Sequence, residues 1–586
     1  MDLSAILNDV QDEESPPVKG EAEPAQITET RHGLPRLLRL PAVLHDPIIS
    51  HLSNRDIKSL RLTCTFFHDV ARLRLHRVFI SAHHRDVQVL RAVADSDTFR
   101  SGVTELIWDD ARLSNFPHLA QAHDENGGDY NSGASDDEED REVPKWFINA
   151  CNENVIDLRS RKGRDADRPE HAEHAAREEQ LNARLPPAAC WAHYQELLRE
   201  QDAVISSGAD EAAFRYALQR FPSLERVTIT PAAHGWLFNP LYGTPTIRAL
   251  PHGLNYPIPR GWPTAPDVCP PRSMQPWLED GGDADGEDYK EQWRGVRIAL
   301  RVLAEPQTEH RITEFVLDAH HLDTGLTCRI FEHPATSVEY TNLCALLRRP
   351  GLARLDLALA VGGQEPLRWP ALRGGHLRAA LAGAPGLRHF SLRTNVAPDL
   401  DVWAPVRSLA RGGGGGNPEH HVPLGGLVVP AGSWTRLRHF GLSGFHVTQA
   451  DVMSLLGALP GSLRSVELSF LYFVDGGGDW RGLLGEMRDT LDWRGREAAC
   501  RPAVVVGHGL MAPWCGRAVW AGREHVGSFL YGDGPNPFGG EGEPAPNQID
   551  MGYGAGVVRD AFDPSYERPY VDNAELIRLG IVKKAR

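Results

Sequence analysis

Apolar and polar residues follow two different periods along this chain, and the two periods succeed one another in the same order several times. In DEAAFRYALQRFPSLERVTIT (210–230), the apolar residues from Ala213 to Phe221 have the i, i+3, i+4 spacing of an amphipathic helix. Those from Leu224 to Ile229 alternate with polar residues, as in a half-buried strand. The pattern predicts a helix, a turn and a strand.

The same order recurs at 341–359, at 377–394 and most clearly at 437–470. There, Leu437 and Leu463 are separated by an interval within the roughly 20 to 29 residues typical of leucine-rich repeats. The chain from 82 to 512 therefore resembles an irregular leucine-rich-repeat region. The resemblance implies an α/β fold in which stacked units share one core in a curved solenoid.

This resemblance is partial, because the spacings vary and the Asn or Cys that usually follows the strand is mostly missing. Weaker copies of the strand pattern occur at 103–110, 312–319 and 502–509. An ordinary α/β domain, with helices flanking a sheet, is the alternative, since helix-then-strand order fits both architectures.

Other segments have neither period. Acidic, Gly-rich or Pro-rich composition predicts disordered insertions near 124–142, 231–293 and 411–422, because such segments bury too little apolar surface to offset the entropy of ordering. The same reasoning predicts a disordered tail at 1–33. We expect an irregular C-terminal cap and tail at 513–586.

The segment 34–81 has a compact helical pattern. Its main part reads LPAVLHDPIISHLSNRDIKSLRLTCTFFHDVARLRLHRVFIS, from residue 40 to residue 81. Ser53 and Asp56 have the spacing of a helix N-terminus, where a hydroxyl and a carboxylate satisfy free backbone N–H groups. A module of this size has a thin core, so apolar side chains on its surface would indicate a partner.

This stretch resembles the F-box, from Leu40-Pro41 to the closing pattern at Leu73–Val78, without a gap. The resemblance implies an adaptor: F-box modules dock on a Skp-type protein, which joins them to cullin and RING subunits of a ubiquitin ligase. The rest of the chain would select an unknown target protein. The residues that the resemblance assigns to apolar contacts with the adaptor, or to the core of the module, are Leu40, Pro41, Leu44, Ile48, Leu52, Ile57 and Leu60.

Three positions depart from the F-box pattern: Val43 stands where Glu is frequent, His45 replaces a leucine, and Pro47 interrupts the first helix. Because proline suits the first turn of a helix, we expect the helix to restart at Asp46. The alternative reading of the module is a helical hairpin that only caps the first repeat of a protein-interaction scaffold.

Net charge and cysteine spacing argue against some classes of function and some cellular compartments. The net charge of −16 and the scattered Lys and Arg residues argue against a nucleic-acid binder, which needs a concentrated basic surface. The eight cysteines are far apart, as expected in a reducing compartment. The N-terminus is acidic and has no long apolar stretch, so we expect a cytoplasmic or nuclear protein without a membrane partner.

We find no sequence pattern that predicts catalysis, a cofactor or a metal. The paired histidines lack a second ligand pair at recognised spacing. Gly441-Leu-Ser443-Gly444 lacks the full nucleophile elbow, and Gly507-His508-Gly509 lacks the third glycine of a dinucleotide fingerprint. The sequence therefore predicts a protein that is not an enzyme.

Overall fold

The computed structural model of the chain describes most of the region between residues 40 and 538. The described residues are 40–52, 54–115, 143–165, 177, 179–259, 261–263, 277, 289–320, 322, 324–362, 364, 369–396, 421, 424–427, 433–474, 476–509, 517–521, 523–538 and 550–553. The predicted tail at 1–33 and the predicted insertions near 124–142 and 411–422 lie outside them, except for His421.

One sheet of twelve strands runs through the described part of the molecule. Its strands are β1 (Arg77–Ser81), β2 (Glu105–Asp109), β3 (Arg226–Thr230), β4 (Glu314–Leu317), β5 (Leu326–Thr327), β6 (Arg354–Ala360), β7 (His389–Thr394), β8 (His439–Val447), β9 (Ser465–Phe473), β10 (Ala503–Gly509), β11 (Arg517–Ala521) and β12 (Asp550–Tyr553). Nine parallel strands, β1 to β4 and β6 to β10, lie beside one another in chain order, and the short β5 pairs in parallel with β6 off this path. The strands β11 and β12 extend the far edge in antiparallel pairing.

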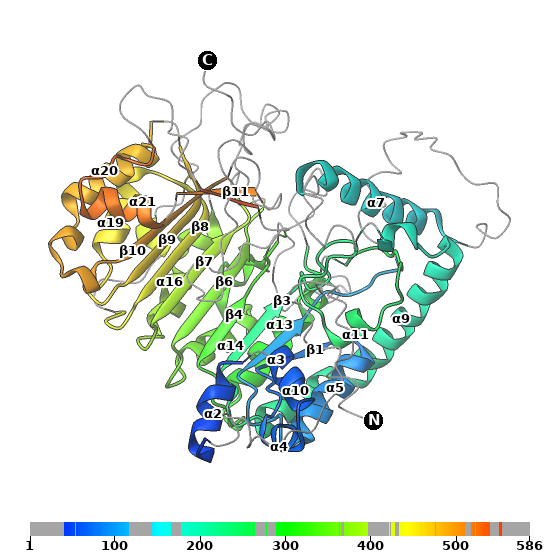
Figure 1. Cartoon of the computed structure of the whole chain (residues 1–586). Helices are drawn as coiled ribbons and strands as arrows, with labels where there is room; N and C mark the ends of the chain where they lie inside the picture. Colours follow the sequence, from blue (N-terminus) through cyan, green and yellow to red (C-terminus); the bar gives the residue numbers. More distant parts are fainter. Residues whose placement is uncertain are drawn as a thin grey trace.

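Helices connect these strands (Figure 1). Their bounds are α2 (Ala42–Ser50), α3 (Asn54–Arg61), α4 (Thr65–Val70), α5 (His84–Asp95), α7 (Lys145–Asp165), α9 (Pro187–Ser207), α10 (Ala209–Arg220), α11 (Pro245–Arg248), α13 (Arg294–Ala304), α14 (Val338–Leu347), α15 (Pro370–Arg373), α16 (His376–Ala382), α18 (Leu424–Leu427), α19 (Gln449–Gly457), α20 (Trp480–Thr490) and α21 (Arg523–Tyr531). Four 3₁₀ turns are η3 (Cys328–Phe331), η4 (Pro334–Thr336), η8 (Asp492–Gly495) and η9 (Ala498–Cys500).

The main core lies between the helices and one face of the sheet. In β6, Leu355 and Leu357 are buried, whereas Arg354 and Asp356 point to the opposite face and are partly exposed. Such alternation follows from the two-residue period of a strand. Because neighbouring strands are paired in register, the same alternation of buried and exposed residues recurs in each strand. One layer of apolar side chains therefore extends from β1 to β10 and packs on helices between α5 and α21.

Polar side chains form lateral rows on the opposite face of the sheet. The first residues of neighbouring strands lie in register, which brings the Arg77 guanidinium to 2.8 Å from the Glu105 carboxylate. The Arg226 guanidinium lies 2.6 Å from the carboxylate of Glu314. Opposite charges on directly paired residues support the register.

The predicted leucine-rich-repeat solenoid is wrong, and the structure is the α/β alternative with helices flanking a sheet. Leaving out the two-residue β5, only Arg77 to Glu105 and His439 to Ser465 begin at an interval typical of repeats, about 20 to 29 residues. The connection from β2 to β3 instead contains the long helices α7 and α9. The prediction failed because a local helix-strand pattern does not fix the length or content of the connections.

The segment 231–293 also differs from the predicted disordered insertion. In its described parts, Trp236, Tyr256, Trp262 and Trp293 are buried. Tyr256 belongs to a second, smaller core with residues of α7 and α9. Aromatic side chains supply large apolar areas that outweigh the abundance of Pro and Gly. Similarly, the region 513–586, predicted to be irregular, contains β11, α21 and β12.

Candidate partner-binding surface

The residues before β1 fold into a three-helix module around a small core of their own. Ile49 from α2, Ile57 from α3 and Ala71 after α4 are buried together. Around them pack the partly buried side chains of Leu52, Leu60, Val70 and Leu73. We call residues 40–76 with α2, α3 and α4 the N-terminal module.

His45 stands where the F-box pattern has a leucine, and its imidazole is buried inside the N-terminal module. Its ring lies 5.1 Å from the ring of Phe66 and 6.2 Å from that of Phe67, edge-on in both cases. Edge-to-face rings pack favourably, so the histidine fills the space between α2 and α4. This departure is accommodated inside the module.

Helix α2 does not restart at Asp46, as the sequence suggested. It runs from Ala42 to Ser50 with Pro47 inside it. Pro47 has no backbone N–H and so cannot donate a hydrogen bond to the carbonyl of Val43. Because Val43 and Pro47 are both exposed, water can donate to that carbonyl instead. A short surface helix therefore tolerates this proline.

The outward side of α2 is apolar. Leu44 and Ile48 are four residues apart and share one side of the helix, while His45 and Ile49 face the module core. Val43 and Pro47 extend the exposed side around the helix. A surface helix normally turns polar residues to solvent, so this arrangement indicates a contact surface.

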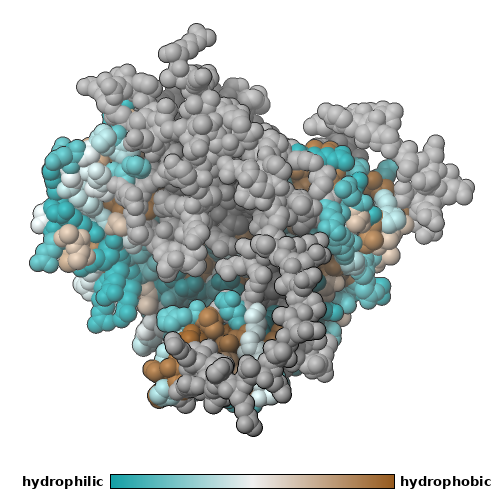
Figure 2. Space-filling model, viewed as in Figure 1, coloured by the Kyte–Doolittle hydropathy of each residue, from teal (hydrophilic) through white to brown (hydrophobic). Residues whose placement is uncertain are grey.

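Two further large apolar side chains of the N-terminal module are exposed. Phe66 packs on His45 but remains 39% exposed, and Leu62, at the turn before α4, is 89% exposed. We define the apolar patch as Val43, Leu44, Ile48, Leu62 and Phe66. Figure 2 shows apolar side chains gathered at the lower end of the molecule, where α2, α3 and α4 lie.

The apolar patch is unusual within the described part of the chain. Seven large hydrophobic residues are exposed there, and five of them belong to the patch. The other two are Ile156 on α7 and Val338 at the start of α14. Single exposed apolar residues are ordinary, whereas several on one small module indicate a contact surface.

The structure separates the seven residues that the F-box resemblance assigned to partner or core contacts. Ile57 is fully buried, and Leu52 and Leu60 pack around it, so these three belong to the core of the module. Leu40 is partly exposed, and Pro41, Leu44 and Ile48 are exposed. Pro41, Leu44 and Ile48 are thus the three of these residues that are exposed to a partner, whereas Leu40 is partly buried like Leu52 and Leu60.

Sequence reasoning missed the outward position of Val43, Leu62 and Phe66. A signal existed for Phe66, because adjacent helical residues point about 100° apart and only one of Phe66 and Phe67 can face the core. Phe67 is the buried one. Nothing in the sequence indicated that the turn at Leu62 leaves this side chain in solvent.

Asn54 and Arg74 tie α2 and α3 to the segment that leads into β1. The Asn54 side chain accepts from the backbone N–H of Arg74 at 2.9 Å and donates to its carbonyl at 2.6 Å. The Arg74 guanidinium donates to the carbonyls of Ser50, at 2.7 Å, and Leu52. Since β1 begins at Arg77, these bonds hold α2 and α3 beside the last residues before the sheet.

A buried group of titratable residues lies at the carboxyl ends of β1 and β2. The His234 ring lies 3.6 Å from the Asp109 carboxylate and hydrogen-bonds the Tyr256 hydroxyl at 2.8 Å. Asp86 accepts from the Ser81 hydroxyl at 2.6 Å and from the backbone N–H of Thr246 at 2.8 Å. These contacts hold the segment 231–259 against the strand ends.

Burial controls the ionisation of this group. It lowers the pKa of His83 from 6.5 to about 4 and that of His234 to about 3, and it raises the pKa of Asp109 well above its ordinary value. Both imidazoles are therefore neutral at pH 7. Because His83, Asp109 and His234 are each at most 5% exposed, we assign them a structural role.

Other chemistry is sparse in the residues that the structure describes. They contain no cluster of three His, Cys, Asp or Glu side chains that could hold a metal ion. None of their helices is both long and apolar enough to cross a membrane.

No protein-family model matches the chain, and a search of curated proteins gave no match. The functional argument therefore depends on the residues of the N-terminal module and their geometry.

Proposed function

We propose that the chain is a substrate receptor of a cullin-type ubiquitin ligase, which binds a Skp-type adaptor through the N-terminal module and a target protein through the rest of the chain. The exposure of the apolar patch on α2 and α4 is the observation that carries the proposal. A partner that covered the patch would remove several large apolar side chains from water, at about 25 cal/mol for each Å².

In this role the protein acts by proximity and needs no cofactor. The adaptor joins the N-terminal module to the cullin and RING subunits, and a bound target presents its lysines to the charged conjugating enzyme at high effective concentration. The bonds of Asn54 and Arg74 hold α2 and α3 beside the segment that leads into the sheet. The cytoplasm and the nucleus are the compartments we propose.

The alternative is a protein-interaction scaffold in which the N-terminal module is only a structural cap. A cap stabilises a sheet by burying apolar residues against it. Leu75 and Val78, at the junction with β1, do join the main core. The apolar patch, however, is exposed, which favours a separate partner.

The proposal is tested by co-purification of the full chain with a Skp-type adaptor and a cullin. We expect the wild type to retain both proteins. The double variant Leu44→Ala/Ile48→Ala should weaken adaptor binding at least about tenfold, because both side chains would be central to the contact. It should keep the melting temperature of the wild type, since both side chains are exposed.

Ile156→Ala is the matched control, because Ile156 is 65% exposed on α7, outside the N-terminal module. This variant should bind the adaptor like the wild type. Failure of the wild type to retain the adaptor would contradict the proposal and favour the scaffold.

A further inference from the structure

An arginine stands directly before each of the neighbouring strands β7, β8 and β9, which lie side by side in the sheet (Figure 1). The three arginines are Arg388, Arg438 and Arg464. The backbone N–H of Arg438 donates to the carbonyl of Arg388, and that of Arg464 donates to the carbonyl of Arg438, each at 2.7 Å. Because neighbouring strands are about 4.8 Å apart, the three residues span about 10 Å across the amino ends of these strands. We call them, together with Arg436 in the turn before β8, the arginine row.

The arginine row has no carboxylate partner among the residues that the structure describes. Arg388, Arg436 and Arg438 are exposed, and their side chains form no hydrogen bond or ion pair there. Arg464 is half-buried, and its guanidinium donates to two backbone carbonyls, at 3.1 and 2.8 Å, and to the sulfur of Cys500 at 3.5 Å. All of these acceptors are uncharged, so the positive charge of the row is not compensated by them.

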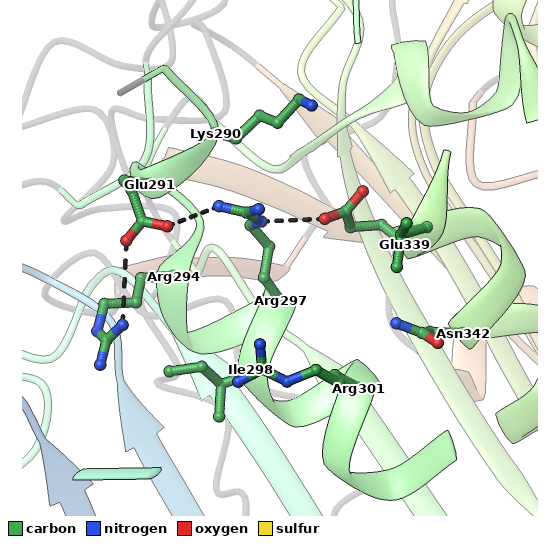
Figure 3. Close-up of a pocket in the computed structure, with 9 residues that line it drawn as sticks. Lys290, Glu291, Arg294, Arg297, Ile298, Arg301, Glu339 and Asn342 are labelled. Atoms are coloured by element: carbon green, nitrogen blue, oxygen red, sulfur yellow. Dashed lines mark hydrogen bonds and ion pairs between the residues drawn. The ribbon is translucent and has the colours of Figure 1, made fainter. Parts of the chain in front are cut away.

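Several arginines in other parts of the molecule are, by contrast, paired with carboxylates. Arg77, Arg226 and Arg354 are the first residues of β1, β3 and β6, and each lies 2.6 to 2.8 Å from a carboxylate oxygen. Between α13 and α14, Arg297 lies between two carboxylates, at 2.6 and 3.0 Å (Figure 3). The guanidinium groups of these arginines are neutralised within the chain, whereas those of the arginine row are not.

The segments that carry the arginine row are poor in acidic residues. Residues 369–396, which contain α15, α16 and β7, have four arginines and no Asp or Glu. Residues 433–450, which contain β8, have two arginines and again no Asp or Glu. Beyond β9, the carboxylate of Asp492 pairs with Arg496 at 2.8 Å. A region of positive charge therefore lies in a chain whose net charge is −16.

The arrangement of the arginine row costs stability. Like charges at laterally paired positions of neighbouring strands repel one another, which destabilises the folded chain. Single exposed arginines are ordinary, but adjacent ones without a carboxylate leave this repulsion in place. A bound anion would offset it, and binding sites are where a chain retains groups that lower its own stability. The row therefore indicates a site for an anionic partner.

We propose that the arginine row binds a short acidic segment of a partner protein, which lies across the amino ends of β7, β8 and β9. Alternate side chains of an extended segment point to the same side about 7 Å apart, so two or three of its carboxylates cover the row. Each guanidinium can bind a carboxylate through two parallel hydrogen bonds. The negative charge of the whole chain disfavours the long phosphate backbone of a nucleic acid. Because the row shares no residue with the apolar patch, the proposal does not depend on adaptor binding.

Fluorescence anisotropy with labelled ligands tests the proposal on the full chain. The first peptide alternates Glu and Thr over about ten residues, which places every carboxylate on one side of an extended chain. The second has Gln in place of each Glu, and the third ligand is a thymidine oligonucleotide of similar length. We expect saturable binding of the first peptide and at least about tenfold weaker binding of the second, since charge-assisted hydrogen bonds are stronger than neutral ones. Binding of the first should weaken as salt is raised.

Matched substitutions locate the binding. Arg388→Gln and Arg438→Gln should each weaken binding of the acidic peptide at least about fivefold, because each removes a charged donor. Arg77→Gln removes the same charge from the first residue of β1, but Arg77 already pairs with Glu105, so binding should be unchanged. Arg438→Gln should also keep or raise the melting temperature, because it relieves repulsion within the row.

Equal binding of the two peptides, or wild-type affinity in both Arg388→Gln and Arg438→Gln, would overturn the proposal. Lower melting temperatures of both variants would assign the row a structural role and would overturn it too. Binding of the oligonucleotide as tight as that of the acidic peptide would instead identify a site for a phosphate backbone. None of these results bears on adaptor binding, which is measured separately on the apolar patch.

Discussion

The N-terminal module and the sheet differ in where they place their apolar side chains. In β7, Phe390 and Leu392 are buried among the helices, and Ser391 between them faces the polar side of the sheet. In α2, Leu44 and Ile48 lie on the solvent side of the helix. The apolar residues of the sheet are thus buried within the chain, whereas the N-terminal module leaves several of its own apolar residues exposed.

Size explains part of this difference. The main core extends from β1 to β10, whereas the N-terminal module has a small cluster of Ile49, Ile57 and Ala71, with His45 and Phe67 also buried. Small modules bury a smaller fraction of their surface. Size does not explain the clustering, since the patch residues could have been polar without loss of the core. The comparison supports a contact function for the module.

The largest expected effect comes from truncating the centre of the main core. Phe390→Ala should lower the free energy of unfolding by about 3 to 5 kcal/mol, because it removes a fully buried ring and leaves a cavity. Urea denaturation followed by tryptophan fluorescence would measure this loss.

Leu62→Ala is the contrasting variant from the apolar patch. It should change the free energy of unfolding by less than about 0.5 kcal/mol, because Leu62 is exposed. A loss comparable to that of Phe390→Ala would mean that the patch is covered within the chain, and the comparison would fail.

The fold was predictable from sequence only in its local units. The segment 210–230 does form α10 and β3, and 437–470 contains β8, α19 and the start of β9, as the two periods indicated. The overall architecture was not predictable from them, because connection lengths vary. Aromatic residues such as Trp262 and Trp293 become buried through contacts distant in sequence, which no local pattern reveals.

The candidate site was predictable as a segment but not as a surface. Helical spacing and the F-box resemblance indicated Leu44, Ile48 and Ile57 alike. Whether each faces out or in depends on how α2, α3 and α4 pack, and Ile57 proved to be core. The burial of His45 beside Phe66 could not be inferred either, because it requires the position of α4 relative to α2.

An acid-induced loss of stability should arise in the sheet region and depend on His83. Its pKa is about 4 in the folded chain and 6.5 when unfolded, because burial disfavours the charged ring. The unfolded chain therefore binds a proton that the folded chain does not, and stability falls as the pH drops from 6.5 to 4. From pH 7 to pH 5 this residue should cost about 2 kcal/mol.

His83→Gln, which stays neutral, should lose less stability than the wild type over the same interval of pH. The buried Asp110 shifts stability in the opposite direction, because burial raises its pKa to about 6. Because the wild type and His83→Gln both contain Asp110, its contribution cancels in the difference between their losses of stability. Urea denaturation at pH 7 and pH 5 measures the difference, and equal losses would show that His83 does not titrate on unfolding.

A local effect is expected where α3 is tied to the segment that leads into β1. Asn54→Ala removes both hydrogen bonds between its side chain and the backbone of Arg74. The expected cost is about 1 to 2 kcal/mol, because two part-buried backbone groups lose their partners. Hydrogen exchange should accelerate at residues 54–76 and remain unchanged in β6 and β7, since opening is local.

Thr63→Ala is the matched control, because its hydroxyl bonds only the carbonyl of Leu60, at 2.7 Å, on the exposed turn after α3. This variant should leave exchange at the junction unchanged. If Asn54→Ala also exchanges like the wild type, the Arg74 guanidinium, bonded to the Ser50 carbonyl, holds the module in place by itself. If exchange accelerates in the sheet as well, the two regions unfold as one unit, and the contrast between them is confined to their surfaces.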